Sequence, residues 1–380
     1  MASILMINLP IAGHTNPTLP LTEMLVQRGH DVSYINGEKF RRQIENTGAE
    51  FIPYDSDQTS LNFRQKERRC FRDVFDTAIN LEKKYDLLIY EMYYFPGIKI
   101  AEILGIPAIR QFSQRALNQK IFSETSLYFK LSGAILNHRV RAIKHAKYIG
   151  LTNNTLGKAI INDKPMLNIV YIPQIFQKYR ESFGEDYLFA FPLKKGIPGS
   201  QKLPYEEMKS PIVYISLGSL INKKGFYKKC IRAFGGKDIS VILNTGRIPP
   251  ETLGEIPENI YAYPYVPQLE VLQHADAFLT HCGMNSINEA MNFAVPLVAM
   301  PIISDQAYNA ERIVELGIGK KVSYFKSSGR QLYQTVLDVC NNEYIKSRCL
   351  KMQSVLEKET TLEEVVGVIE KEFSNNEKIH

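Results

Sequence analysis

The most informative stretch of the chain runs from Tyr265 to Gln306, YVPQLEVLQHADAFLTHCGMNSINEAMNFAVPLVAMPIISDQ. Short apolar runs alternate in it with helical patterns, and polar residues gather where the apolar runs end. The apolar run Ala277–Leu279 ends in Thr280-His281-Cys282-Gly283, and a helix is predicted to begin at Met284-Asn285-Ser286. Because the first backbone N–H groups of a helix lack intrahelical partners and the helix dipole favours negative charge there, this junction predicts an anion site.

Two further groups belong to the same predicted site. Glu289 follows Asn285 by four residues, so both share one face of the helix. The next apolar run, Pro296–Met300, leads to Asp305-Gln306. The site therefore offers groups for a phosphate, a diol and a polyhydroxylated ring, which are the three parts of a nucleotide sugar.

The alternation of strands and helices extends over the chain and indicates an α/β protein with parallel sheets wound on both faces. Two helices are predicted at Pro17–Arg28 and Gly97–Leu104, and a third at Thr361–Phe373, which begins with a capping-box pattern. Strands are predicted at Ile4–Leu9, Asp31–Ile35, Leu87–Tyr90, Pro107–Phe112, Asn168–Ile172, Tyr187–Phe189, Ile212–Ser216, Ile239–Asn244, Ile260–Tyr263, Ala277–Leu279 and Pro296–Met300.

The pattern stops between Pro192 and Pro211, where proline and glycine punctuate a polar segment. A chain of 380 residues fits two domains. We therefore expect an N-terminal domain over 1–192, a linker over 193–210, a second domain over 211–360 and a final helical segment over 361–380.

Composition narrows the class of protein. Hydrophobic residues make up 44% and charged residues 23%, which is ordinary for a soluble globular chain. The five scattered cysteines show no metal or redox spacing and predict reduced thiols in a cytoplasmic protein. The net charge is +6, with twelve Lys/Arg against two acidic residues in the segment 110–180. That segment suits either an ordinary solvated surface or contact with an anionic membrane surface, while the absence of a recognition motif argues against nucleic acid.

With these residues in place, the Tyr265–Gln306 stretch resembles the donor-binding signature of the family 1 glycosyltransferases, which move sugars from UDP-sugars to small acceptors. The bacterial members that modify macrolides and flavonoids look most similar. The resemblance implies the GT-B fold, in which two Rossmann-like domains with doubly wound parallel sheets face a cleft. It also implies that the final helix crosses back onto the N-terminal domain.

The resemblance assigns a role to each donor-site residue. His281 would contact the diphosphate, helped by Gly283, Asn285 and Ser286. Ser219, in the strand-to-loop turn Leu217-Gly218-Ser219, would reach the phosphates from the other side. Glu289 would accept hydrogen bonds from the ribose hydroxyls, and the Tyr265 ring would stack on the base. The full donor set is Ser219, Tyr265, Val266, Gln268, His281, Gly283, Asn285, Ser286, Glu289, Asp305 and Gln306, with the last two holding the transferred sugar.

Catalysis is expected from His14 and Glu91. His14 follows the first strand in a predicted loop, just before Asn16 and Pro17, which suit the N-cap and N1 positions of a helix. A neutral histidine can take the proton of an acceptor hydroxyl near physiological pH. Glu91 ends a neighbouring strand at the same sheet edge, where the family usually carries Asp, so the longer side chain leaves the His–carboxylate distance open. The alternative is a histidine that packs at a helix entry and a glutamate at a strand end.

The aromatic residues Tyr93, Tyr94, Phe95 and Phe112 suit either an acceptor-binding wall or core packing.

Asp55-Ser56-Asp57 resembles a metal-binding Asp-x-Asp, but we interpret it as a solvated loop. We expect no metal and no other cofactor, because the helix N-terminus and His281 would replace a metal's charge. A monomer or homodimer fits.

These observations predict an inverting, metal-independent glycosyltransferase that moves a hexose, most simply glucose from UDP-glucose, to a small lipophilic hydroxyl acceptor such as a flavonoid, phenol or macrolide. Two alternatives stay open. One is a nucleotide-sugar-binding auxiliary subunit with little transferase activity, favoured by Glu91. The other is a transferase with a lipid acceptor, favoured by the basic segment.

Overall fold

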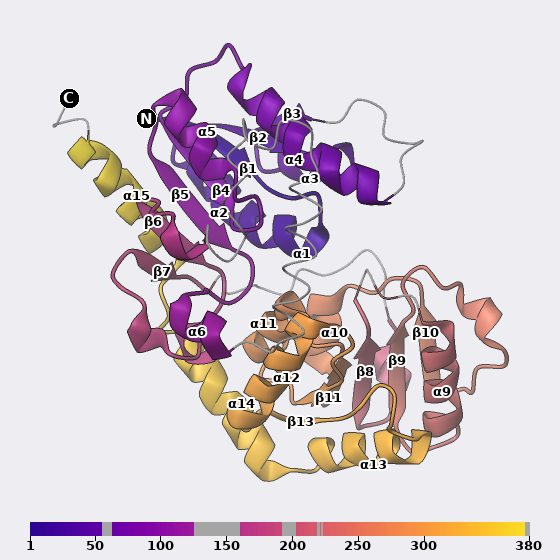
Figure 1. Ribbon diagram of the computed structural model, residues 1–380. Coiled ribbons are helices and arrows are strands. Elements are labelled where there is room, and N and C mark those ends of the chain that lie inside the picture. Colours follow the sequence, from indigo (N-terminus) through magenta and orange to yellow (C-terminus); the bar gives the residue numbers. More distant parts are fainter. Residues whose placement is uncertain (55–62, 125–159, 192–202, 219–220, 222, 377–380) are drawn as a thin grey trace. The chain divides into compact units, whose positions relative to one another are not determined.

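The computed structural model describes residues 1–54, 63–124, 160–191, 203–218, 221 and 223–376. The chain forms two compact units (Figure 1). Unit 1 comprises Met1–Pro192 together with Glu359–His380, and unit 2 comprises Leu193–Lys358. Each unit is built around one parallel sheet flanked by helices, so the predicted α/β class is confirmed for both.

The sheet of unit 1 has seven strands in the order β3-β2-β1-β4-β5-β6-β7, paired in parallel throughout. Its central strands β1, β4 and β5 are buried along almost their whole length, as expected for a parallel sheet covered by helices on both faces. The strands are β1 Ser3–Ile7, β2 Asp31–Asn36, β3 Glu50–Pro53, β4 Leu87–Glu91, β5 Ala108–Phe112, β6 Leu167–Val170 and β7 Tyr187–Phe189.

Seven helices of unit 1 lie within the described residues: α1 Ala12–Thr15, α2 Leu19–Gln27, α3 Arg41–Glu45, α4 Phe63–Ile79, α5 Gly97–Leu104, α6 Gln119–Glu124 and α15 Leu362–Asn376. The predicted capping box of α15 is present, since the Thr361 N–H donates to the Glu364 carboxylate at 2.7 Å and the Glu364 N–H donates to Thr361 Oγ1 at 3.2 Å.

Helix α15 belongs to unit 1 although it follows unit 2 in the sequence. Its Val365, Val366 and Ile369 are fully buried in one hydrophobic cluster with Leu21 and Leu25 of α2. Figure 1 shows this yellow helix beside the purple strands of the first sheet. The core of unit 1 is therefore completed by residues that lie more than 300 positions from α2 in the sequence.

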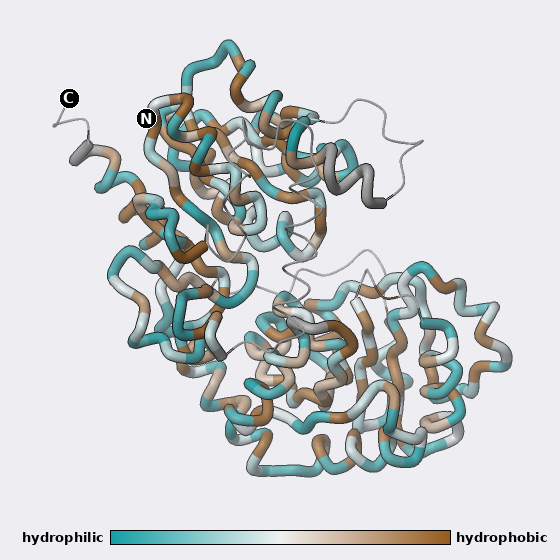
Figure 2. Tube along the Cα trace, viewed as in Figure 1, coloured by the Kyte–Doolittle hydropathy of each residue, from teal (hydrophilic) through white to brown (hydrophobic). Residues whose placement is uncertain are grey.

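The sheet of unit 2 has six parallel strands in the order β10-β9-β8-β11-β12-β13. They are β8 Ile212–Ser216, β9 Ser240–Asn244, β10 Ile260–Tyr263, β11 Ala277–Thr280, β12 Leu297–Ala299 and β13 Gly319–Lys321. The helices are α9 Lys224–Phe234, α10 Gln268–His274, α11 Met284–Asn292, α12 Ser304–Glu315, α13 Gly329–Cys340 and α14 Glu343–Leu356. Figure 2 shows the hydrophobic residues of both units concentrated along the strands.

Candidate functional site

His14 lies in the short helix α1 and not in a loop as predicted. Asn16 is not an N-cap as predicted but the C-cap of α1, because α1 runs directly into a 3-10 turn at Asn16–Thr18 and then into α2. Pro17 is accommodated in that turn, where its missing N–H leaves no ladder bond unmade. Consecutive helical turns therefore hold His14 just beyond the end of β1.

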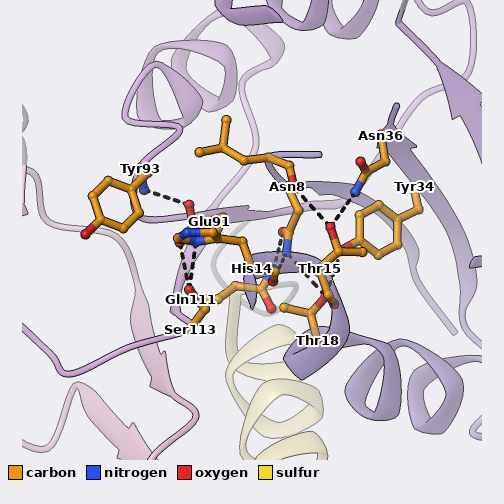
Figure 3. Close-up of polar contacts among 11 residues, drawn as sticks. Asn8, His14, Thr15, Thr18, Tyr34, Asn36, Glu91, Tyr93, Gln111 and Ser113 are labelled. Atoms are coloured by element: carbon orange, nitrogen blue, oxygen red, sulfur yellow. Dashed lines mark hydrogen bonds and ion pairs between the residues drawn. The ribbon is translucent and has the colours of Figure 1, made fainter. Parts of the chain in front are cut away.

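His14 and Glu91 are in contact. His14 Nδ1 lies 2.9 Å from Glu91 Oε1, and the Glu91 side chain is fully buried while that of His14 keeps 12% exposure. Strands β1 and β4 are parallel neighbours, so their carboxyl ends deliver both residues to one sheet edge. Glu91 Oε2 accepts a 2.8 Å bond from the Tyr93 N–H, which fixes the carboxylate from its other side (Figure 3). The extra methylene of Glu91 thus leaves it within bonding distance of the imidazole.

A buried polar chain holds the backbone of His14. The Asn8 amide donates to the His14 carbonyl at 3.0 Å, and the Gln111 amide donates to Asn8 Oδ1 at 2.9 Å. The Tyr171 hydroxyl in turn donates to Gln111 Oε1 at 2.6 Å. All three supporting residues are almost completely buried, so each of these bonds is protected from water. Asn8, Gln111 and Tyr171 have no sequence signal, because a single polar residue within or just after a strand carries no motif.

Thr15 and Thr18, which flank this turn, are also bonded into the sheet. The Asn36 amide donates to Thr15 Oγ1 at 3.1 Å, and Thr18 Oγ1 lies 2.7 Å from the Tyr34 hydroxyl. Figure 3 shows these side chains on the opposite side of α1 from Glu91. The segment that carries His14 is therefore anchored from two sides.

Of the four aromatic candidates, Tyr93 lies against His14, with the ring centroids 5.1 Å apart in an edge-on arrangement. Tyr94 and Phe112 are fully buried, and Phe95 is 5% exposed. Tyr94 stacks on Phe71 and donates its hydroxyl hydrogen to the Phe71 carbonyl. Those three rings pack in the core of unit 1, so Tyr93 is the one of the four beside the histidine.

In unit 2 the predicted anion junction is a true helix start. Gly283 precedes α11 in extended conformation, so the first N–H groups of that helix point out of its N-terminus. His281 lies between two glycines: a Cβ added to Gly218 would come within 2.6 Å of its Cε1, and one added to Gly283 within 2.5 Å of its Nε2. Both glycines are thus required by the position of the imidazole.

Burial lowers the pKa of His281 to about 4. Its Nδ1 is buried without a hydrogen-bond partner among the residues the structure describes. The imidazole is therefore neutral near pH 7. It can donate or accept a hydrogen bond, while the positive field at this point comes from the N-terminus of α11.

Gln268, the first residue of α10, contacts two other residues of the predicted donor set. Its amide nitrogen donates to Glu289 Oε2 at 2.6 Å and lies 3.4 Å from Ser286 Oγ. Its oxygen accepts from the Tyr214 hydroxyl at 3.0 Å. The structure thus brings three of the predicted donor-site residues, Gln268, Ser286 and Glu289, together on neighbouring helices.

The base and sugar positions differ in how much the structure describes. Tyr265 is 70% exposed, whereas the next residue, Val266, is buried. Gln306 is buried, and its side-chain oxygen accepts 2.9 Å bonds from the Ile302 and Ile303 N–H groups. Ser219 and the side chain of Asp305 lie outside the described residues, as does Asp55-Ser56-Asp57.

One supporting residue in unit 2 also lacked a sequence signal. Cys282 has a positive φ of 67°, which is uncommon for a residue with a side chain. The buried Asn309 amide of α12 donates to the Cys282 carbonyl at 3.0 Å. Asn309 therefore helps to hold the turn that carries His281.

The described part of the basic segment is not all surface. Arg110 is 3% exposed and donates to Asn168 Oδ1 at 2.9 Å, and Arg115 is 6% exposed. Residues 125–159 of the segment lie outside the described residues.

Across the described ranges no helix combines the length and apolarity needed to cross a membrane. The same part of the chain contains no group of three or more His, Cys, Asp or Glu able to hold a metal ion.

Comparison with known proteins adds independent information. Residues 205–364 match the family model described as UDP-glucoronosyl and UDP-glucosyl transferase. The chain is 32% identical to the NDP-glycosyltransferase YjiC of Bacillus subtilis strain 168, over 97% of this chain and 96% of that protein. It is 27% identical to the oleandomycin glycosyltransferase of Streptomyces antibioticus, over 98% of this chain and 91% of that protein.

The fold also has solved counterparts. The crystal structure of the glycotransferase of kitacinnamycin superposes with a TM-score of 0.83 at 27% identity, covering 97% of this chain and 98% of that one. Together with the two parallel-sheet units, this match confirms the GT-B fold that the resemblance implied.

Proposed function

The chain belongs to the UDP-glucoronosyl and UDP-glucosyl transferase family, the family 1 glycosyltransferases, and from that membership we propose an inverting, metal-independent transfer of glucose from UDP-glucose to a small lipophilic hydroxyl acceptor. His14 is the base, Glu91 orients it, and unit 2 binds the donor. The contact between His14 and the buried Glu91 is the observation that carries this proposal.

The contact determines which nitrogen of His14 acts. A carboxylate can only accept hydrogen bonds, so with Glu91 Oε1 at 2.9 Å the imidazole proton belongs on Nδ1. The lone pair is then on Nε2, which takes the proton of the acceptor hydroxyl. Buried Glu91 stabilises the imidazolium that results, in the manner of the carboxylate of a catalytic triad.

The transfer is a single displacement. As the acceptor oxygen loses its proton to His14, it forms a bond to the anomeric carbon. The bond from that carbon to the diphosphate oxygen breaks, and UDP leaves with the electron pair. Because one displacement exchanges one face of the carbon for the other, the anomeric configuration inverts.

Unit 2 stabilises the departing diphosphate. The N-terminus of α11 supplies backbone N–H groups and the positive end of a helix dipole, and His281 supplies a neutral hydrogen-bonding nitrogen. The Tyr265 ring, 70% exposed, stacks on the base, and Gln268 with Glu289 binds the ribose hydroxyls. Gln306 donates its amide hydrogens to the transferred sugar.

Two observations favour a small lipophilic acceptor over a lipid. The relatives include an oleandomycin glycosyltransferase, named for a small-molecule acceptor, and the rings of Tyr93 and His14 lie together beside the proton-accepting position. Arg110 and Arg115 of the basic segment are buried and serve the interior instead of a membrane surface.

Replacing His14 by Ala tests the proposal. Turnover should fall by roughly 10²–10⁴ because the general base is lost. UDP binding, measured by calorimetry, should be unchanged, and His274→Ala in unit 2 serves as a histidine control with normal turnover. Near-normal turnover of His14→Ala would sink the assignment of the base.

A donor screen tests the sugar and nucleotide. UDP-glucose, UDP-galactose, UDP-GlcNAc and dTDP-glucose are offered with mixed phenolic acceptors, and products are read by mass spectrometry. UDP-glucose should give the largest yield, unchanged by EDTA. Preference for dTDP-glucose or for another hexose would overturn the donor, and loss of activity in EDTA would overturn metal independence.

A further inference from the structure

Ser113 follows β5 directly and touches both members of the catalytic pair. Its Oγ lies 2.8 Å from His14 Nδ1 and 3.2 Å from Glu91 Oε1. The side chain is 1% exposed, so the bonds are sheltered from water. Figure 3 shows Ser113 beside the edge of the imidazole, next to the bond between His14 and Glu91.

His14 Nδ1, Glu91 Oε1 and Ser113 Oγ lie within hydrogen-bond distance of one another. Two hydrogens are available for these contacts, one on Nδ1 and one on the Ser113 hydroxyl. Glu91 Oε1 accepts only, so the Nδ1 hydrogen of His14 points toward it and toward the neighbouring Ser113 Oγ. The Ser113 hydroxyl hydrogen is then best used on Glu91 Oε1, which it reaches at 3.2 Å. In this arrangement Ser113 accepts from the imidazole and donates to the carboxylate at once.

The sheet brings Ser113 to this point. Strands β4 and β5 are parallel neighbours with Glu91 opposite Gln111, and Ser113 lies two residues beyond Gln111. The Gln111 carbonyl accepts from the Met92 N–H at 2.9 Å, so the pairing continues past Glu91. Gln111 also supports His14 through Asn8, so β5 acts on both the backbone and the ring of His14.

We propose that Ser113 is a positioning residue that locks the ring of His14 and the carboxylate of Glu91 into one arrangement. The proposal rests on the proposed function, since it concerns the same base. Glu91 is one methylene longer than aspartate and has one more rotatable bond, so its carboxylate has more orientations to lose. Ser113 removes that freedom and shares the Nδ1 hydrogen of the imidazolium when His14 takes the acceptor's proton.

The test compares Ser113→Ala with Ser113→Thr. Loss of the hydroxyl should lower kcat about 10–100-fold, the range expected for one hydrogen bond to a charged group. The KM for the sugar donor and the calorimetric affinity for UDP should stay unchanged, because Ser113 is in unit 1 and does not bind the donor. Ser113→Thr keeps the hydroxyl and should recover most of the lost kcat.

Ser33→Ala is the matched control. Ser33 is also a buried serine of the same sheet that donates to a glutamate, Glu50, at 2.6 Å, but it belongs to a different cluster with Lys83. Its substitution removes the same kind of bond and should leave kcat unchanged. If Ser113→Ala does not fold, as judged by circular dichroism, Ser113→Cys replaces it, since a thiol is a weak donor of similar size, and the same loss of kcat is expected.

A double mutant shows whether Ser113 acts through His14. In a His14→Ala background, adding Ser113→Ala should cost no further activity, because the pair it orients is gone. A similar further loss in that background would overturn the proposal and leave a general structural role. Unchanged kcat in Ser113→Ala would also overturn it. If His14→Ala itself keeps normal turnover, the proposed function fails; if His14→Ala is inactive and Ser113→Ala is fully active, the inference about Ser113 alone fails.

Discussion

At the scale of single residues, His14 and His281 lie in different electrostatic surroundings. His14 contacts the buried carboxylate of Glu91 at 2.9 Å, so a proton gained by its ring meets an opposite charge. His281 lies between Gly218 and Gly283, and burial lowers its pKa to about 4. The first arrangement suits a group that must become charged during a reaction, and the second suits one that stays neutral beside a phosphate.

The length of the side chain at position 91 is a testable feature of the pair. Glu91→Gln keeps the shape and removes the charge, so kcat should fall by roughly 10²–10⁴ as the imidazolium loses its partner. Glu91→Asp withdraws the carboxylate from Nδ1 and should cost about 10–100-fold through misplacement. Steady-state kinetics with a phenolic acceptor measures both.

For each variant, a different outcome would contradict the proposed role of Glu91 beside His14. A Glu91→Gln enzyme with normal kcat would show that the negative charge has no part in turnover. A Glu91→Asp enzyme as fast as the parent would show that the reach of the longer side chain is not required. UDP affinity serves as the control in both cases, since residue 91 belongs to unit 1 and the proposed UDP-binding residues belong to unit 2.

His281 should make stability depend on pH. Its pKa is lower in the folded chain than the ordinary value of 6.5, so the unfolded chain binds the proton first as the pH falls. The contribution of His281 to the free energy of unfolding is fully present above about pH 6.5. It is lost between about pH 6.5 and about pH 4, and the total loss is on the order of 3 kcal/mol. Urea unfolding of the parent and of His281→Gln, at about pH 7.5 and about pH 4.5, should show the parent losing more. Equal losses would contradict the neutral, buried state of His281.

At the scale of elements, the start of α11 is shaped by close contacts. Gly283 precedes the helix, and the imidazole of His281 occupies the space where a side chain at 283 would be. The same imidazole fills the space at Gly218, which also has a positive φ of 72°. The predicted anion site therefore combines a helix terminus with two positions at which a Cβ would clash with His281.

Gly283→Ala should weaken UDP binding at least about tenfold, because the new Cβ would lie 2.5 Å from His281 Nε2 and the ring must move. Gly225→Ala is the control in the same unit: it lies in α9 with nothing within 4 Å, and alanine there should stabilise by about 0.5–1 kcal/mol. Calorimetry with UDP separates them. An unchanged UDP affinity in Gly283→Ala would argue against a phosphate at His281.

Strands with strong apolar runs could be predicted from the sequence, and weak ones could not. Tyr187–Phe189, Ile212–Ser216 and Ile260–Tyr263 have the predicted bounds. Strand β3, Glu50–Pro53, ends in a proline, and β13, Gly319–Lys321, is three residues long and mostly charged. Both are strands because a neighbour pairs with them, which no local pattern reveals.

The candidate site shows the same division. His14 and Glu91 could be found because both follow predicted strands and a motif surrounds the histidine. Ser113, Asn8 and Asn309 could not, because a lone hydroxyl or amide gains its meaning from what the fold places beside it. Sequence motifs therefore indicated the proposed reacting groups, whereas the residues that position them were identified only from the tertiary structure.

At the scale of the whole molecule, unit 1 depends on α15. Val365, Val366 and Ile369 are fully buried in its core, and their helix also bonds through Glu370 to His30 at 3.3 Å. This docking lies far from His14 in the sequence and makes the N-terminal unit discontinuous.

Ile369→Ala should destabilise the protein by about 2–5 kcal/mol, since it removes a buried side chain and leaves a cavity. Gly367→Ala, in the same helix with nothing within 4 Å, should instead stabilise by about 0.5–1 kcal/mol. The chain contains no tryptophan, so unfolding is best followed by circular dichroism. Equal stability of the two variants would contradict the docking of α15.

The return of α15 also orders events on the ribosome. The first part of unit 1 ends at Pro192 and the second begins at Glu359, so about 170 residues are synthesised between them. At ordinary translation speeds of roughly 5–20 residues per second this takes on the order of 10–30 s. During that interval the nascent N-terminal half lacks the apolar side chains of α15 that pack with Leu21 and Leu25 of α2, and unit 2 is the first unit whose sequence is complete. We therefore expect chaperones that bind apolar surface to bind the nascent chain during this interval.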